Sequence, residues 1–586
     1  MGHARKGLWN RQEQQMAKRQ NVLEKLAQGI QKINTKVEGI SGNLPEILLI
    51  TAYAVGHLLM ALVHEPWFDE AEAWQIARCV TLKTLFGQAT HYEGHPPLWH
   101  LILMPFAKLG APYELSLTLI SLVFTVAAVG LILWKSPFPR LVRWILPFTY
   151  FLFYQYGVIS RVYCVMTLEF MLLAFLYGSR NEKPARVAIL MMVMCFTNAY
   201  DIVLCGGICI VWLWEITGEK KQGRSFGETV RLLVKDRRIH WLLLLLAAAA
   251  CCIALILPMP DTTAVQKEIG GNENSLFVRL LYTLFILPAD VTVSNIYSDY
   301  TKLQFAGFTW EILLAGVLEG AVIWLLLISY ARRKHTEALL LVPYGLFAVF
   351  AAMVYLYNHH IGIGFLFAVF WLWVSMEKEE KREAVQFELR ESLHSITVLC
   401  AAAALGISVY WTAAVCAADI RYTYSTGRKE AEFIRSHGYA DEKIMTEWQR
   451  YSDPVSGGLV EDVYDSPVAV TIAPYLESNV FINLGQGREN LAYLTHRYPD
   501  KEQTEQEYQC WRQAGEPDLI VGDAGTSRVY PDMKVTDYKM VYQQEIRHLW
   551  KDSKSFHVSK IYVKRDRLKK VMNNDLKYRA CFVHVN

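Results

Sequence analysis

The amino-acid sequence predicts a polytopic α-helical membrane protein with about 11 transmembrane helices and a small α/β domain at the C-terminal end. Composition is the first reason. Of the 586 residues, 53% are hydrophobic and 20% are charged, which is too apolar for an ordinary soluble protein and too charged for membrane spans alone. Long apolar segments recur between residues 44 and 418, and shorter helix-like and strand-like stretches replace them in residues 419–586.

Residues 1–43 predict an amphipathic helix on the cytoplasmic side of the membrane. Apolar residues recur there every three or four positions, and Lys and Arg occupy many of the others. No apolar core follows the basic start before residue 46, so the segment does not have the pattern of a signal peptide. A helix resting on the inner leaflet fits this composition, and a coiled segment that binds a partner is the alternative.

Residues 44–418 predict the membrane domain, because a spanning helix needs about 20 apolar residues. Two apolar runs, residues 98–109 and 275–288, are too short or too interrupted to cross, so we expect interfacial helices there and in the first outer loop as a whole, about residues 69–110. The eleven predicted spans are about residues 45–63, 113–134, 141–157, 164–179, 186–200, 202–216, 241–258, 308–330, 338–357, 360–376 and 393–416.

The distribution of Lys and Arg predicts the orientation. With a cytoplasmic N-terminus, eleven alternating spans bring every strongly basic loop to the cytoplasmic side and leave the opposite loops nearly without basic residues. The odd number of spans then places residues 419–586 outside. The basic loops are residues 135–143, 180–186, 220–238, 332–334 and 378–390.

Residues 419–586 predict an extracytoplasmic α/β domain. We expect a helix at residues 429–434 and buried strands at 468–472, 480–482 and 518–521. No Gly-rich phosphate loop follows any of these strands. The sequence therefore favours a lid or an acceptor-binding accessory over an independent catalytic domain.

Acids and histidines gather directly after the first apolar segment. Asp69, Glu70 and Glu72 occupy three of four positions, and Glu93 and His95 follow a short distance along the chain. Asp69 and Glu70 are also explained by capping of the helix that they begin. His95 has a separate explanation, because the two prolines after it favour the start of a helix, which the histidine would merely precede. Capping does not require three acids at a membrane boundary, where a carboxylate can also take a proton from an attacking hydroxyl.

Further ionisable groups fall in other predicted outer loops. Arg161 and Tyr163 stand in a very short loop, where a guanidinium suits a phosphate or simply snorkels to the interface. Glu169 and Glu311 lie within predicted spans, where a helix-to-helix hydrogen bond is as good an explanation as catalysis. The remaining outer candidates are His91, Asn198, Tyr200, Asp201, Asp290, Asp299, His359 and His360.

Other features of the composition limit the function. The net charge of +3 gives no reason to expect a nucleic-acid partner. Most of the eleven cysteines lie in apolar runs, where a thiol behaves as a small hydrophobe, and neither a disulfide framework nor a zinc spacing is visible. The acids and histidines of the first outer loop lack a recognisable metal-ligand spacing, so the cofactor stays unknown and a divalent cation stays open.

Two motifs bound the first outer loop, which opens with Asp69-Glu70-Ala71 and closes with His95-Pro96-Pro97-Leu98. One span precedes this loop, and ten predicted spans and an outward domain follow it. Over residues 44–416 this arrangement resembles the glycosyltransferase C superfamily. Within it, the nearest resemblance is to bacterial membrane transferases related to protein O-mannosyltransferases and to the aminoarabinose transferase of lipid A.

The resemblance implies an enzyme of the bacterial plasma membrane that takes a sugar from a polyprenyl phosphate. The acceptor hydroxyl, on a cell-envelope glycan, lipid or protein, would enter from outside. In such families the acid of the first outer loop is the catalytic base, which implies that role for Asp69 with Glu70 beside it. The His-Pro-Pro segment lies beside the donor phosphate, which implies substrate binding by His95, with Glu93 in the same loop.

Three further features of the sequence bear on the resemblance. The family's Ser-Arg-x-Tyr in the second outer loop matches Ser160, Arg161 and Tyr163. Where relatives tend to have an arginine or lysine in a late outer loop, this chain has His359 and His360, which either bind phosphate or are simply interfacial. Relatives often have an arginine after a glutamate in the span that follows the His-Pro-Pro helix, but here Leu115 follows Glu114.

Two other functions compete with a transferase. A transporter or lipid flippase is one, although internal repeats and mid-membrane broken helices, which are typical of such proteins, are not evident. A non-catalytic protein with the same fold is the other, and the missing arginine after Glu114 favours it.

Overall fold

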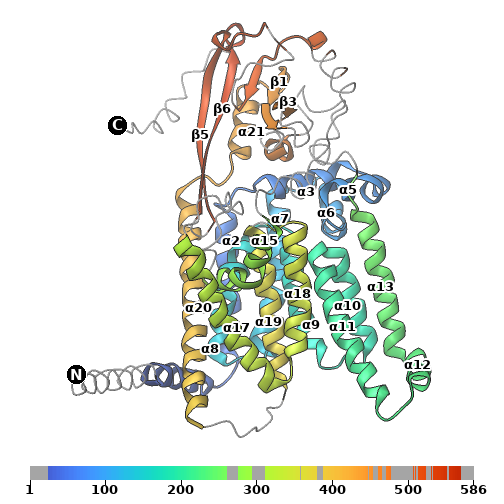
Figure 1. Cartoon of the computed structure of the whole chain (residues 1–586). Coiled ribbons are helices and arrows are strands. Elements are labelled where there is room, and N and C mark those ends of the chain that lie inside the picture. The colour runs from blue at the N-terminus through green and yellow to red at the C-terminus, as the bar shows by residue number, and fades with distance from the viewer. Residues whose placement is uncertain are drawn as a thin grey trace, which may run out of the picture.

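The computed structural model describes residues 24–259, 275–293, 310–356, 358–378, 387–446 and, with gaps, parts of 448–568. A bundle of helices forms the larger part of the molecule, and a smaller α/β domain sits on one end of it (Figure 1). That end of the bundle is called the domain end below. The architecture agrees with a polytopic helical protein that carries a C-terminal α/β domain.

In the part of the chain that the structure describes, six helices are long and apolar enough to cross a membrane. Many of their leucines and valines are exposed on the outside of the bundle, which water would penalise and lipid would solvate. These helices indicate an integral membrane protein. They are α2 (Leu44–Ala61), α7 (Tyr113–Lys135), α11 (Ala199–Lys221), α13 (Arg237–Ile256), the segment Leu314–Lys334 of α17 (Trp310–Lys334) and the segment Ser395–Arg421 of α20 (Phe387–Arg421).

Four shorter apolar helices complete the interior of the bundle: α9 (Tyr163–Tyr177), α10 (Pro184–Thr197), α18 (Glu337–Met353) and α19 (Ile361–Glu377). Ten of the eleven predicted spans therefore correspond to helices. How many of them cross the membrane, and the cytoplasmic placement of the N-terminus, stay predictions.

The predicted span at residues 141–157 is not one continuous α-helix. The chain forms α8 (Arg140–Ile145), a 3-10 turn (Leu146–Phe148) and a π-helical segment, η3 (Tyr150–Val158). Pro147 has no N–H to donate, and Thr149 adopts an extended backbone with φ −71° and ψ 157°. These two residues interrupt the helical hydrogen bonding that the apolar composition alone would favour.

Short helices lie across the domain end of the bundle (Figure 1). The predicted interfacial helix at residues 98–109 corresponds to α6 (Leu98–Lys108), which packs against α3 (Phe68–Cys79). The predicted run at residues 275–288 likewise forms only short pieces, with no single long helix among them. The elements of the two regions are α3 (Phe68–Cys79), α4 (Leu82–Thr84), η1 (Leu85–Ala89), α5 (Thr90–Glu93) and α6 (Leu98–Lys108), then α15 (Leu276–Leu281), η4 (Tyr282–Ile286) and α16 (Leu287–Val293).

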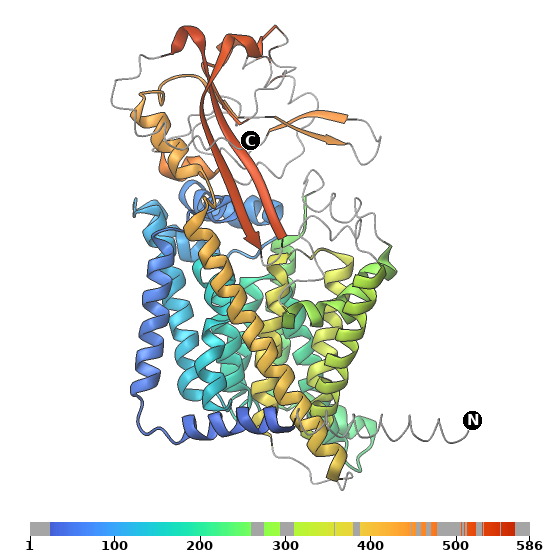
Figure 2. The same cartoon turned by 90° about the vertical axis from the view of Figure 1, so that its left-hand side faces the viewer.

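The N-terminal helix, described for residues 24–38, runs across the bundle at the end opposite the α/β domain (Figure 2). The Nε of Arg140 donates to Glu46 in α2 at 2.6 Å. The same residue attaches the N-terminal helix, because its Nη1 donates to the Val37 carbonyl at 3.3 Å. Its backbone N–H also donates to Glu38 at 2.5 Å. The predicted amphipathic helix is thus present from residue 24 on, while residues 1–23 lie outside the described part of the chain.

Also at this opposite end, α12 (Phe226–Val234) begins with a capping box, in which the Ser225 side chain and the Glu228 carboxylate each accept a backbone N–H of the other's residue. It connects α11 to α13 within the predicted basic loop at residues 220–238.

The C-terminal domain packs helix α21 (Gly427–Ser436) on a four-stranded sheet of order β1-β4-β6-β5. The β1 and β4 strands pair in parallel and the other pairs are antiparallel. A separate hairpin joins the remaining two strands. The strands are β1 (Ile444–Thr446), β4 (Leu519–Val521), β5 (Tyr538–Trp550) and β6 (Ser553–Lys564) in the sheet, and β2 (Trp448–Ser452) and β3 (Leu459–Tyr464) in the hairpin.

The sequence predicted this domain only in part. The helix at 429–434 lies within α21, and the strand at 518–521 corresponds to β4, so both predictions are confirmed. The strand at 468–472 is wrong for residues 470–472, which are helical and run into the 3-10 turn η7 (Ala473–Tyr475), where Pro474 has no N–H for a strand ladder. The predicted strand at 480–482 lies outside the described residues.

Polar contacts dock this domain on the bundle. The backbone N–H of Arg428 donates to Glu65 at 2.7 Å, and its guanidinium donates to Glu114 at 2.7 Å. Glu114 also accepts from the hydroxyl of Tyr475. The long β5–β6 ribbon reaches down to the end of α20 (Figure 2), where Gln544 donates to Thr423 at 3.2 Å.

Candidate functional site

The candidate site begins at the N-terminus of α3, where Glu70 joins two loops. One carboxylate oxygen of Glu70 accepts the backbone N–H of Trp67 at 3.1 Å, which satisfies a donor in the first turn of α3. The other accepts the N–H of Ser160 at 2.6 Å. Because Glu70 is only 1% exposed, its carboxylate fixes the loop that carries Arg161 against the start of α3.

His64 connects Glu70 to the last apolar helix. Its Nδ1 lies 2.8 Å from the Asp419 carboxylate, and its Nε2 lies 3.4 Å from Glu70. Tyr154 donates to the same Asp419 oxygen at 2.9 Å. Burial lowers the pKa of His64, but Asp419 and Glu70 outweigh it and raise the pKa to about 10. His64 is therefore a buried cation between two carboxylates.

Asp69, the neighbour of Glu70, pairs with Arg161. The Nη1 of the guanidinium lies 2.5 Å from Asp69, and the two side chains keep 12% and 19% exposure, respectively. The guanidinium carbon also lies 5.2 Å from the ring centre of Tyr163 and 6.0 Å from that of Trp67. Burial lowers the pKa of Arg161, but Asp69 first and then Tyr163, Glu70 and Glu72 raise it, so the group stays charged.

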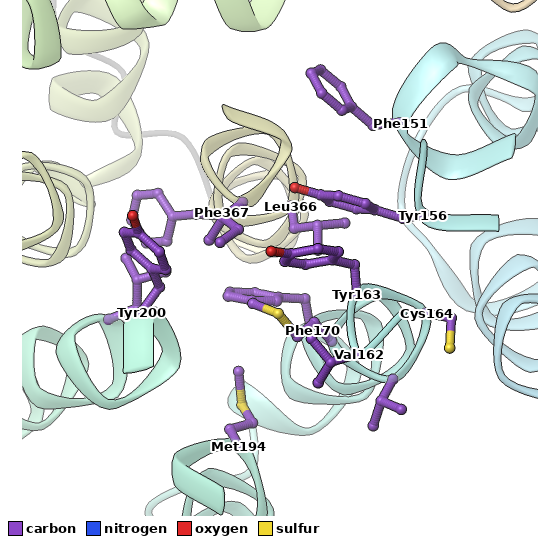
Figure 3. Packing of buried hydrophobic residues seen from close by; sticks show 14 of the residues in the cluster. Phe151, Tyr156, Val162, Tyr163, Cys164, Phe170, Met194, Tyr200, Leu366 and Phe367 are labelled. Atoms are coloured by element: carbon purple, nitrogen blue, oxygen red, sulfur yellow. The ribbon is translucent and has the colours of Figure 1, made fainter. Parts of the chain in front are cut away.

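Aromatic rings connect this ion pair to the two histidines. Tyr163 stacks on Tyr156 at 4.6 Å between ring centres (Figure 3), and Tyr156 donates to the His359 carbonyl at 2.6 Å. The ring of His359 lies 5.9 Å from that of Tyr163 and 4.1 Å from that of His360. Burial, followed by Arg161 and His95, lowers the pKa of His359 well below the ordinary range, so this imidazole is neutral.

The other predicted residues of the first outer loop have different surroundings. His95 is half-buried after Gly94, which ends α5 with a φ of +65°, and it is close enough to lower the pKa of both His359 and His360. Glu93 is the last residue of α5, and its substrate-binding role stays a prediction. His91 hydrogen-bonds the Leu257 carbonyl at 2.7 Å, at the end of α13.

The remaining polar candidates are buried between helices. Glu169 of α9 accepts from Thr197 of α10 at 2.7 Å, which confirms the helix-to-helix hydrogen bond. Asp201, in the first turn of α11, is fully buried, and neither of its oxygens has a hydrogen-bond partner in the described part of the chain. Tyr200 lies with its ring 4.9 Å from that of His360.

Three predicted positions lie away from this site or outside the described residues. Asp290 accepts from Tyr282 at 2.6 Å. Asp299 and the side chain of Glu311 lie outside the described residues.

Sequence reasoning missed four residues at or beside the site: His64, Tyr154, Asp419 and Arg428. His64 and Asp419 could have been flagged, because an ionisable residue at the end of an apolar span is costly unless it is paired. Arg428 supplies the cation that is missing after Glu114, from a different domain. No spacing in the sequence connects these two residues, which are 314 positions apart.

Around the ion pair of Arg161 and Asp69, the site brings together further carboxylates and the neutral imidazoles of His359 and His360. In the described part of the chain, no group of three or more His, Cys, Asp or Glu side chains could hold a metal ion. A search against protein-family models and a search of curated proteins both find no match to this chain.

Proposed function

We propose that this protein is a membrane glycosyltransferase that moves a sugar from a polyprenyl-phosphate donor to an acceptor hydroxyl on the outer face of the membrane. The observation that carries the proposal is the pairing of Asp69 with Arg161 at the domain end of an apolar bundle. A carboxylate and a guanidinium in one partly exposed site suit proton abstraction and phosphate binding. The sequence resemblance to the glycosyltransferase C superfamily points to the same chemistry.

In the proposed reaction, the acceptor oxygen attacks the anomeric carbon from the side opposite the phosphate. The new carbon–oxygen bond forms as the bond to the phosphate oxygen breaks, and that oxygen keeps the electron pair. Asp69 takes the acceptor proton. Arg161 and the N–H groups of His359 and His360 stabilise the charge that develops on the departing polyprenyl phosphate. The anomeric configuration is inverted.

The experiment is a transfer assay with the purified protein in lipid nanodiscs and a panel of radiolabelled polyprenyl-phosphate sugars. Each donor is incubated with envelope glycan, lipid and protein acceptors, and label in the acceptor is counted. We expect transfer from at least one donor by the wild-type protein. If no donor of the panel binds or reacts, the proposal is wrong.

The outer placement of the site has its own test. Two single-cysteine variants, Glu93→Cys and Gly223→Cys, are exposed to an impermeant thiol reagent in intact cells. Since the basic loop at residues 220–238 predicts a cytoplasmic position, the thiol at position 93 should react and the thiol at position 223 should not. The opposite pattern would put the site on the cytoplasmic face and contradict the proposed donor geometry.

A transporter or flippase is the second candidate, and Asp201 is the observation that favours it. A buried acid in the first turn of an apolar helix is typical of ion or substrate pathways. Movement of a fluorescent polyprenyl phosphate across proteoliposomes, abolished by Asp201→Asn and unaffected by Asp69→Asn, would favour transport over transfer.

A further inference from the structure

The contact between Asp69 and Arg161 joins the two groups to which the proposed function gives separate tasks. Nη1 of Arg161 is 2.5 Å from the Asp69 carboxylate. A carboxylate held by a guanidinium is a weakened base, because the positive charge favours its ionised form. The contact is an ion pair without hydrogen-bond geometry, because Nη1 has no hydrogen-bond partner in the described part of the chain, so the attraction of Asp69 holds the guanidinium in place without using up this donor. The closed pair therefore limits Asp69 as a base and keeps Arg161 beside it.

We propose that this ion pair is a latch that the donor phosphate opens. The phosphate takes Nη1 of Arg161 from Asp69, and the released carboxylate becomes a base for the acceptor hydroxyl. The inference rests on the proposed function and adds an order to it: the donor binds first, and its binding produces the active base.

The geometry of displacement supports the opening. A general base lies about 2.6–3.2 Å from the acceptor oxygen, and that oxygen lies about 3–3.5 Å from the carbon it attacks. The phosphate oxygen is on the far side of that carbon. The carboxylate and the phosphate are then more than about 6 Å apart along the line of attack, so one nitrogen cannot hydrogen-bond both at about 3 Å. Nη1 has to leave Asp69 if it is to bind the phosphate.

Charge supports the same conclusion. Asp69, Glu70 and Glu72 all act on Arg161 and together outnumber it. Glu70 is held by the backbone N–H groups of Trp67 and Ser160, so its position is fixed. Asp69 keeps 19% exposure and is the acid that competes directly for the guanidinium. An incoming phosphate therefore displaces Asp69 and leaves Glu70 in place.

The test measures binding of a polyprenyl phosphate without sugar to the protein in nanodiscs. Asp69→Asn removes the competitor of the phosphate, so we expect binding to tighten about tenfold, which corresponds to about 1.4 kcal/mol. The matched control is Glu72→Gln, which also removes one negative charge near Arg161 but leaves the ion pair intact. It should change the affinity by no more than about twofold, that is, by about 0.4 kcal/mol.

Other outcomes overturn the latch. Equal tightening in both variants would mean that only charge repulsion was relieved. Unchanged or weaker binding in Asp69→Asn would mean that Arg161 bridges both groups. If the tightening is due to the freed arginine, Arg161→Gln in the Asp69→Asn background should remove it. Asp69→Ser serves as a second variant if the asparagine variant does not fold.

The failure of the latch and the failure of the proposed function give different results. If the wild-type protein binds no polyprenyl phosphate, both the latch and the proposed function are wrong. A wild-type protein that binds the lipid, with no gain in Asp69→Asn, removes only the latch.

Discussion

Two polar clusters lie side by side at the domain end of the bundle. Each cluster contains one of two neighbouring residues of α3, Asp69 or Glu70. The His64 cluster consists of His64, Glu70, Tyr154 and Asp419. The Arg161 cluster consists of Arg161, Asp69, Tyr163, His359 and His360. Glu70 and Asp69 are neighbours in the sequence, yet they belong to different clusters.

The clusters differ in how far the protein itself satisfies their charges. His64 and Glu70 are 4% and 1% exposed, and both oxygens of Glu70 accept hydrogen bonds from other parts of the chain. In the Arg161 cluster the ion pair is partly exposed, with 12% exposure of Arg161 and 19% of Asp69. We infer that the His64 cluster holds the loop that carries Arg161 in position. We infer that the Arg161 cluster takes part in the proposed transfer reaction.

The sharpest test of this comparison is Asp69→Asn. Asparagine keeps the size and the capping ability of aspartate but not its basicity. Turnover in the transfer assay should fall by about 10²–10⁴-fold, the usual contribution of general-base catalysis. The melting temperature should stay near that of the wild type. Asp441→Asn, an exposed position in the other domain, is the control. Transfer at near the wild-type rate would show that Asp69 is not the general base.

His64→Ala should damage stability more than any change in the Arg161 cluster. It leaves Asp419 and Glu70 buried without their cation, and removal of one partner from a buried ion pair costs about 3–5 kcal/mol. Thermal unfolding of the purified protein in detergent measures the effect. A melting temperature equal to that of the wild type would mean that the His64 cluster does not hold the fold together.

The same histidine predicts a pH dependence. Because its folded-state pKa is raised to about 10, above the ordinary value of 6.5, its contribution to stability is complete below pH 6.5. The contribution is then lost as the pH rises through about 10. The melting temperature of the wild-type protein should therefore decline over this range, and His64→Ala should decline less. Parallel curves for the two proteins would contradict a protonated His64.

Glu70→Gln should have a smaller effect on stability than His64→Ala and a smaller effect on turnover than Asp69→Asn. Glu70 acts by holding the Ser160 loop against the start of α3. A glutamine has only one acceptor oxygen, so it cannot accept from both Trp67 and Ser160, and one buried N–H is left facing an NH2 group. Loss of a buried hydrogen bond in this way costs about 1–3 kcal/mol of stability. Since the Ser160 loop carries Arg161, the variant should also raise the KM for the donor more than it lowers kcat. A fall in kcat as large as in Asp69→Asn would instead make Glu70 the base.

Arg428→Ala should have the smallest effect. The contact of Arg428 with Glu114 is more than one-third exposed on the arginine side, and such pairs contribute about 0.2–1 kcal/mol. The backbone N–H that donates to Glu65 remains in the variant. The rate of limited proteolysis between the two domains should rise only slightly. A complete release of the C-terminal domain would show that this single ion pair docks it.

The sequence by itself determined that the chain forms a bundle of apolar helices, and it identified several of the ionisable residues at the candidate site. Apolar runs of sufficient length require lipid or burial, so composition alone predicted the helical bundle. The same argument drew attention to Asp69 and Arg161, because ionisable groups beside apolar spans are costly unless they are used. The local helix and strand patterns of the sequence also predicted α21 and β4, where most of the apolar residues of the pattern are buried.

Only the tertiary structure decided which partners these groups have. The pairing of Asp69 with Arg161 and of His64 with Asp419 joins residues that are far apart in the sequence, and no local periodicity encodes such contacts. The two acids Asp69 and Glu70 look alike in the sequence. They differ because successive residues of a helix point in different directions, so that Glu70 accepts from the backbone N–H groups of Trp67 and Ser160 while Asp69 contacts Arg161 and stays partly exposed.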